Sequence, residues 1–268
     1  MKILKNEKGQ ALTPKTVFMN KSAFDNHENI EITWLGNASI MINSYGTNMM
    51  IDPLLEGFDM PLLMEMPILP QDVPHLDGVL ITHIDNDHFS RLTCKDLSGV
   101  CESYHSTHYV AGEMINEGLN GFGHDIGETF DIKNIKVTLT KAVHNWQNGS
   151  KKWAFREWKI EDYCGYWIET AGKTIWLPGD SKLIEEHLHM PKPDVILFDF
   201  ADNEWHITLD GAIQLANTYP YAKLICIHWG CVDAPNMSPF NGNPESLLER
   251  VVNPDRIIVL APGEKYIL

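Results

Sequence analysis

Four potential metal ligands fall within six positions directly after the apolar run at residues 78–81. They are His83, Asp85, Asp87 and His88. Successive side chains of a β-strand point to opposite faces, so the first three can point the same way beyond a strand's end while His88 turns in behind them. No lysine or arginine lies among them, and carboxylates this close repel one another unless a cation offsets their charge. Imidazole suits zinc and iron, whereas carboxylate oxygen suits harder ions, so the pattern predicts one or two transition metals rather than a solvated polar loop.

The chain of 268 residues is acidic, with 21 lysines and arginines against 36 aspartates and glutamates and a formal charge of −15. Such a charge repels a phosphate backbone, which argues against nucleic acid and anionic membranes as partners and favours cations. No run approaches the roughly 18 apolar residues of a membrane span, and no apolar segment follows the charged amino end. We therefore expect a soluble cytoplasmic protein. The five cysteines form no CxxC pair, which argues against a disulfide framework or a thiolate zinc site.

From residue 30 onwards, short β-rich runs alternate with helical segments, which indicates a layered α/β fold. We expect residues 1–29 to be an irregular amino-terminal arm, residues 30–268 to form a single domain, and residues 31–51 to form an antiparallel meander. Strands are expected at 31–35, 39–43, 48–51, 100–103, 130–132, 135–140, 163–170, 173–177, 194–198, 222–227 and 256–260. Helices are expected at 91–97, 105–117, 183–188, 209–217 and 244–251.

Two long segments without a regular pattern are candidates for contact with a substrate. Residues 54–76 carry three methionines and several prolines, and form either a flap over the substrate or a packed structural loop. Residues 145–162 combine three tryptophans with cationic side chains, and form either an anion-binding patch or a solvated loop. The candidate substrate-binding residues are Trp146, Lys151, Lys152, Arg156 and Trp229.

Three further expected strand ends carry a potential ligand, namely His144, Asp180 and His228. An apolar strand, then a ligand, then a turn, repeated in this order, resembles the metallo-β-lactamase fold superfamily from about residue 31 to the end. Within it the chain looks most like the ascorbate-6-phosphate lactonase-like branch of metal-dependent hydrolases. The segments that carry this likeness are 33–39, 51–53, 177–181 and 261–264. The resemblance implies a four-layer αββα sandwich.

The resemblance also implies the grouping of the ligands. The first metal would bind His83, His144 and Asp180. The second would bind Asp87, His88, Asp180 and His228, so that Asp180 is shared. Asp52 matches a family carboxylate that orients ligands from behind. Asp87 is the candidate catalytic residue, because it lies near the attacking water in the family geometry and can orient that water or take its proton.

The chain departs from the family pattern at one position, since Asp85 stands where the usual H-x-H-x-D-H motif has its second histidine. In one case Asp85 binds a metal and makes the first site suitable for manganese or iron as well as zinc. In the other case Asp85 points away, and only one ion binds tightly. We therefore expect one or two divalent ions, with zinc first and manganese or iron as alternatives.

The resemblance implies a metal-dependent hydrolase, lactonase-like or phosphodiesterase-like, that uses a metal-bound hydroxide on a small, anionic ester, lactone or phosphoester. Two rival functions stay open. One is a di-iron redox protein that reduces oxygen or nitric oxide, as the resembling flavodiiron proteins do, although no flavin fingerprint is visible. The other is a non-catalytic binding module with an altered metal site. The expected partner is a small molecule, and self-association into a homo-oligomer stays open.

Overall fold

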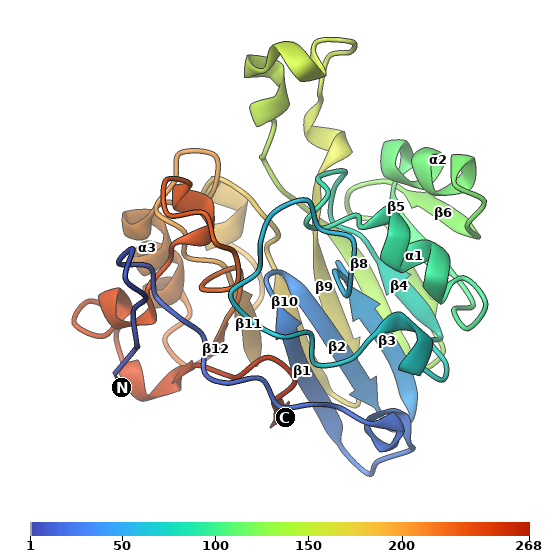
Figure 1. Cartoon of the computed structure of the whole chain (residues 1–268), viewed down its shortest axis with the longest axis horizontal. Coiled ribbons are helices and arrows are strands. Elements are labelled where there is room, and N and C mark those ends of the chain that lie inside the picture. The colour runs from blue at the N-terminus through green and yellow to red at the C-terminus, as the bar shows by residue number, and fades with distance from the viewer. Residues whose placement is uncertain (1) are drawn as a thin grey trace.

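The computed structural model describes residues 2–268 and is built on two seven-stranded mixed sheets (Figure 1). The strands are β1 (Ile30–Gly36), β2 (Ser39–Ser44), β3 (Thr47–Ile51), β4 (Gly78–Leu80), β5 (Tyr104–Thr107), β6 (Gly121–His124), β7 (Thr129–Ile132), β8 (Ile135–Lys141), β9 (Cys164–Thr170), β10 (Lys173–Leu177), β11 (Val195–Phe198), β12 (Lys223–Cys226), β13 (Ile257–Ile258) and β14 (Lys265–Ile267). The first sheet has the order β14-β1-β2-β3-β4-β5-β6, and the second has the order β13-β12-β11-β10-β9-β8-β7. As expected, β1, β2 and β3 pair antiparallel.

Alternate residues of the first sheet's strands face two different cores. In β2, Ile40 and Ile42 belong to the cluster that the two sheets share, whereas Met41 belongs to a second cluster on the outer face. Met50 of β3 joins Met41 there. A strand covered on both faces must be apolar throughout, and β1, β2 and β3 are buried along their whole length.

Three α-helices cover the outer faces of the two sheets: α1 (Arg91–Leu97), α2 (His108–Asn116) and α3 (Leu209–Thr218) (Figure 1). Val110 and Met114 of α2 pack into the outer cluster of the first sheet, and Leu215 of α3 packs with the second sheet. The buried guanidinium of Arg256 donates to carbonyl oxygens at the end of α3, including that of Ala216. The layers therefore run helix, sheet, sheet, helix, which confirms the predicted αββα sandwich.

Several expected elements differ in position or type. The strand expected at 100–103 lies at Tyr104–Thr107, where pairing with β4 and β6 overrides the helical composition. The helices expected at 183–188 and 244–251 are single 3-10 turns, Glu185–Leu188 and Pro244–Leu247. Strands β6 and β14 were not expected; the glycine-rich sequence of β6 carries little β-propensity.

Residues 54–76 pack on the molecule with one short 3-10 helix, Pro70–Asp72. The Met64 sulfur lies so close to Gly36 that a Cβ there would meet it at 2.5 Å. Along residues 2–29, the Val17 amide donates to the Pro262 carbonyl, and Lys8 pairs with Asp233. Within residues 2–268, no helix has both the length and the apolarity needed to cross a membrane.

A pair of hydrogen-bonded histidines lies on β5 and β6. His124 Nδ1 lies 3.0 Å from a Glu128 carboxylate oxygen, and its Nε2 lies 3.0 Å from His105 Nδ1. His105 Nε2 lies 2.9 Å from the Ser103 hydroxyl oxygen. Burial, reinforced by the neighbouring His124, lowers the pKa of His105 to about 4. His105 therefore stays neutral in the folded protein under mildly acidic conditions.

This pair predicts a loss of stability in mild acid. An unfolded histidine takes up a proton near pH 6.5, so between pH 6.5 and 4 position 105 binds more protons in the unfolded chain than in the folded one. The free energy of unfolding should therefore fall as the pH falls, by up to about 3 kcal/mol from His105. We expect His105→Gln to flatten this dependence in urea unfolding with a chelator present. The exposed His189→Gln is the control, and parallel profiles for wild type and His105→Gln would contradict the prediction.

Candidate metal centre

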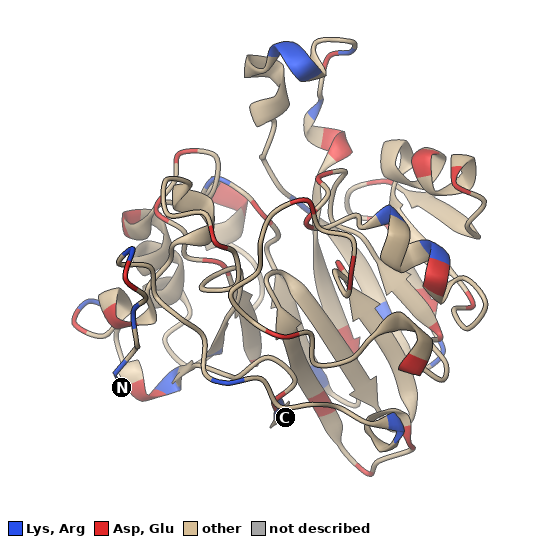
Figure 2. Ribbon diagram, viewed as in Figure 1, with Lys and Arg blue, Asp and Glu red and all other residues tan. Residues whose placement is uncertain are grey.

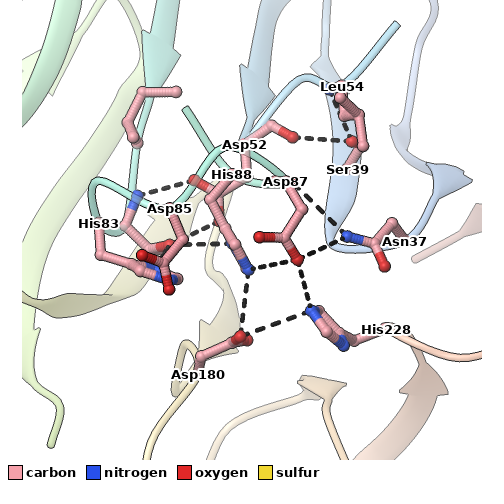
Figure 3. A network of polar contacts seen from close by, with 12 residues as sticks. Asn37, Ser39, Asp52, Leu54, His83, Asp85, Asp87, His88, Asp180 and His228 are labelled. Carbon is pink, nitrogen blue, oxygen red and sulfur yellow. Dashed lines mark hydrogen bonds and ion pairs between the residues drawn. The ribbon is translucent and has the colours of Figure 1, made fainter. Parts of the chain in front are cut away.

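The seven predicted ligands lie in loops that each follow the carboxyl end of a strand. The segment 83–88 follows β4, and the loops after β8, β10 and β12 carry His144, Asp180 and His228. Strands β10, β11 and β12 are parallel neighbours, so their carboxyl ends meet at one edge of the sheet. Figure 3 shows side chains of the 83–88 segment facing Asp180 and His228. The structure therefore brings all seven residues together.

The potential ligand atoms form two groups. In the first, Asp85 Oδ2 lies 3.3 Å from His83 Nε2 and 3.5 Å from His144 Nε2. In the second, Asp87 Oδ2 lies 3.5 Å from His88 Nε2 and 3.3 Å from His228 Nε2. Two ligands of one tetrahedral zinc ion, each about 2.1 Å from the metal, are about 3.4 Å apart. These separations therefore fit bound ions, and Asp85 points into the site.

Asp180 lies against the second group. Its Oδ2 is 3.1 Å from His88 Nε2 and 3.4 Å from His228 Nε2. The same carboxylate and His83 and His88 offer three ligand atoms within 4.8 Å of one another. A residue that faces both groups can be shared by two ions, which is the role that the resemblance implies for Asp180.

The four histidines of this set are oriented through Nδ1, and each turns Nε2 toward the cluster. When an oxygen accepts the Nδ1–H, the Nε2 lone pair is free to bind a cation. The oxygens facing Nδ1 are Thr82 Oγ1 for His83 at 2.9 Å, Asp52 Oδ2 for His88 at 2.8 Å, the Trp205 carbonyl for His144 at 2.7 Å and the Pro239 carbonyl for His228 at 3.2 Å.

Asp52 lies behind the ligands, where the sequence analysis placed it. Its carboxylate accepts hydrogen bonds from the Thr82 amide and hydroxyl, both at 2.7 Å, and from His88 Nδ1 (Figure 3). The Ser39 hydroxyl donates to the Asp52 carbonyl at 2.7 Å and accepts from the Leu54 amide. Asp52 thus ties the end of β3 to the start of the ligand segment and fixes the His88 ring.

Both carboxylate oxygens of Asp85 are held by the 145–162 lobe, which projects from the sandwich (Figure 1). Trp146 Nε1 donates to Asp85 Oδ2 at 2.8 Å, and Gln147 Nε2 donates to Oδ1 at 2.6 Å. The Tyr163 hydroxyl in turn donates to the Gln147 side-chain oxygen. A carboxylate can accept both hydrogen bonds and still face a cation, whereas a histidine that binds a metal has no acceptor left for them. This gives a physical reason for aspartate at position 85.

The other predicted substrate-binding residues lie apart from the ligands or are already engaged. Lys151 and Lys152 are exposed, and their positive charges lie on a short helix of the projecting lobe (Figure 2). Arg156 is paired with both oxygens of Asp162, at 3.0 and 2.8 Å. Trp229 is 1% exposed and stacks on Trp34 in the core, so it has no surface to offer a substrate. Trp146 holds Asp85.

The cluster balances its carboxylates against imidazoles. Burial works to raise the pKa of Asp87, but His88 and His228 outweigh it and hold that pKa at about 2. Burial works to lower the pKa of His228, but Asp180 and Asp87 outweigh it and raise that pKa to about 9. Ligand histidines held protonated by carboxylates are groups from which a divalent cation can displace protons.

Two buried nitrogen atoms test whether the residues fit a metal. The Nε2 atoms of His83 and His88 lie 3.3 Å from Asp85 Oδ2 and 3.1 Å from Asp180 Oδ2, but within residues 2–268 neither has a hydrogen bond with acceptable geometry. Leaving such a buried polar atom unpaired costs about 1–3 kcal/mol. A cation bound to these nitrogens would remove that cost, so the donor set fits a metal centre.

The structure adds polar side chains that the sequence analysis missed. Asn37 Nδ2 lies 3.3 Å from Asp87 Oδ2, and the Asn37 carbonyl accepts from the His228 amide. His206 Nε2 lies 3.6 Å from Asp180 Oδ2, and its Nδ1 lies 2.7 Å from Asp199 Oδ2. Asp199 directly follows the strand expected at 194–198, so the strand-then-ligand pattern could have found it. Asn37 looks like an ordinary turn residue and carries no such signal.

The two-sheet sandwich with histidines and aspartates in the loops at one edge defines a protein of the metallo-β-lactamase type. The family model described as the β-lactamase superfamily domain matches residues 47–229. The chain therefore belongs to the β-lactamase superfamily.

Similar proteins cover most of the chain. A UPF0173 metal-dependent hydrolase of Korarchaeum cryptofilum is 26% identical over 246 residues, which cover 88% of this chain and 99% of that protein. The structure of isothiocyanate hydrolase from Delia radicum gut bacteria is similar with a TM-score of 0.71 and 18% identity, covering 89% of this chain and 98% of that one. CmlA, a diiron β-hydroxylase from Streptomyces venezuelae, is similar with a TM-score of 0.69 and 13% identity, covering 90% and 55%. The two solved structures share the fold.

Proposed function

We propose that the protein is a metal-dependent hydrolase that acts on a small, anionic ester, lactone or phosphoester. The observation that carries the proposal is the convergence of seven buried or nearly buried ligand side chains, with the Nε2 atoms of His83 and His88 turned inward and without a well-aligned hydrogen bond. The relatives named metal-dependent hydrolases, which match along nearly their whole length, support the reaction class.

The residues divide into two ligand sets and a group that orients them. His83, Asp85 and His144 would hold one ion, and Asp87, His88 and His228 would hold a second, with Asp180 shared. When bound, divalent ions such as zinc, manganese or iron lower the pKa of a water molecule and polarise the scissile bond. Asp87, ionised beside the second ion, would orient the attacking water or take its proton.

A cation next to the ligands supports an anionic substrate. Lys182 lies two residues after Asp180, and its Nζ is 4.0 Å from the Trp205 ring centroid. The Trp205 carbonyl also accepts the hydrogen bond from His144 Nδ1. Lys182 therefore lies at the margin of the metal centre in an otherwise acidic chain, where a positive charge attracts anions. Lys151 and Lys152 of the lobe remain predicted contacts for the anionic group of the substrate.

Removal of the metal tests this function. We expect protein stripped with a chelator to lose turnover on a panel of lactones and phosphodiesters, and to regain it when zinc or manganese is added. Metal analysis of the untreated protein gives the number of ions per chain. Turnover that survives complete metal removal would contradict the proposal.

A di-iron redox protein is the second candidate, favoured by one observation. Asp85 turns its carboxylate toward His83 and His144, and carboxylate-rich ligand sets suit iron. Aerobically purified protein would then contain iron and absorb visible light. A colourless, zinc-loaded protein with hydrolytic activity would exclude this candidate.

A further inference from the structure

A fifth imidazole lies beside the seven predicted ligands. His206 is 4% exposed, and its ring centroid lies 5.0 Å from that of His144 and 5.2 Å from that of His228. It lies on the segment after β11, which is the strand between β10 and β12 in the parallel part of the second sheet. Since β10 and β12 lead to Asp180 and His228, the His206 segment leaves the sheet between two ligand loops.

His206 is oriented in the same way as the other four histidines. Its Nδ1 lies 2.7 Å from Asp199 Oδ2, and the other carboxylate oxygen of Asp199 accepts a hydrogen bond from the Ala201 amide at 2.9 Å. A carboxylate that accepts the Nδ1–H fixes the ring and makes Nε2 a stronger electron-pair donor. His88 is held by Asp52 through the same kind of contact. The pair of His206 and Asp199 therefore has the geometry of a metal-binding histidine with its supporting carboxylate.

The residues around His206 Nε2 indicate an ion that it can reach. It lies 3.6 Å from Asp180 Oδ2, close to the separation of two ligands on one ion. His144, Asp180 and His206 offer ligand atoms within 4.8 Å of one another, as do His83, Asp85 and His144. His144 belongs to both groups, so His206 and the first ligand set can serve the same ion.

We propose that His206 binds the first metal ion through Nε2, together with His144 and Asp180, and that Asp199 is its positioning residue. The inference rests on the proposed function only in requiring a bound metal. An ion held by Asp85 and Asp180 has a carboxylate-rich environment, and a further imidazole shifts its preference from manganese toward zinc. His206 thus contributes to the choice of metal as well as to affinity.

Metal binding by three variants of the full chain tests this proposal. The variants are His206→Gln, Asp199→Asn, and His187→Gln as a control on a buried histidine outside the cluster. Zinc and manganese affinities are measured by competition with a chromophoric chelator, and the cobalt(II)-loaded proteins are compared by visible absorption. Circular dichroism verifies that each variant is folded.

We expect Asp199→Asn to weaken zinc binding at the first ion's site by roughly 10–100-fold. His206→Gln should weaken it at least as much. Manganese binding should fall less than zinc binding. The cobalt spectrum should change in His206→Gln, which loses a nitrogen ligand, and stay as in wild type for His187→Gln. If His206→Gln does not fold, Asp199→Asn decides the matter through its zinc affinity.

The outcomes separate this inference from the proposed function. A wild-type protein that binds no metal would overturn both. A wild-type protein that binds zinc, with His206→Gln of equal zinc affinity and unchanged cobalt spectrum, would overturn the ligand assignment alone. In that case a raised KM in His206→Gln would indicate that His206 contacts the substrate instead.

Discussion

Asp180→Asn should lower metal-dependent turnover by roughly 1,000-fold, because an ion that acts as a Lewis acid lowers the activation barrier by several kcal/mol. Asp180 Oδ2 lies 3.1 Å from His88 Nε2 and 3.4 Å from His228 Nε2. Burial works to raise the pKa of Asp180, but His228, His88 and His206 outweigh it and hold that pKa well below its usual value. The residue is thus a negative charge in the middle of the imidazoles. An amide of the same shape has no charge to bind two ions.

The measurement is kcat/KM at saturating zinc together with the metal content per chain. The nearly isosteric amide should leave the fold intact, which thermal unfolding verifies. Asp210→Asn, at an exposed carboxylate paired with Arg250, is the matched control and should retain wild-type turnover. An Asp180→Asn protein that keeps both its ions and its activity would show that this carboxylate is not a ligand.

Asp85→His should reduce metal binding, although it restores the histidine that is usual in this motif. The carboxylate accepts hydrogen bonds from both Trp146 and Gln147, and a histidine that binds a metal could accept neither. Both donors would then face an N–H group, and the 145–162 lobe would lose its attachment to the ligand segment. We expect metal affinity to fall by roughly 10–100-fold, the usual cost of disturbing the contacts behind a ligand.

Limited proteolysis provides a second, independent measurement. Lys151 and Lys152 are exposed trypsin sites on the lobe, and Asp85→His should accelerate cleavage there relative to wild type. Trp146→Phe is the matched variant, because it removes one hydrogen bond and leaves Asp85 free to bind a metal. It should accelerate cleavage with a smaller loss of metal. Tighter metal binding by Asp85→His with an equally protected lobe would contradict this account of position 85.

Much of the fold and most of the ligand set could be predicted from local sequence. The β-strands of the sandwich are short and apolar, so their composition alone separates them from the turns. A ligand placed directly after such a strand is also a local feature, and this is why His83, His144, Asp180 and His228 could be predicted. Asp52 was predicted from the family resemblance, and it too comes directly after a strand, β3.

The errors occur where tertiary contacts outweigh local pattern. Trp229 is adjacent to His228, but its ring lies in the core against Trp34. Arg156 appeared available to an anion until the structure paired it with Asp162. Residues 104–107 have helical neighbours, yet they form a strand because β4 and β6 lie on either side.

The sequence by itself determined the short strands and the ligands that follow them, because strand patterns and strand-end residues are properties of short segments. The αββα sandwich and the grouping of the ligands came from the family resemblance. Only the tertiary structure decided which further side chains join them. His206 is eight positions beyond the end of β11, and Trp146 and Gln147 are about 60 positions from Asp85. Such partners are selected by the path of loops between packed sheets, which no local spacing encodes.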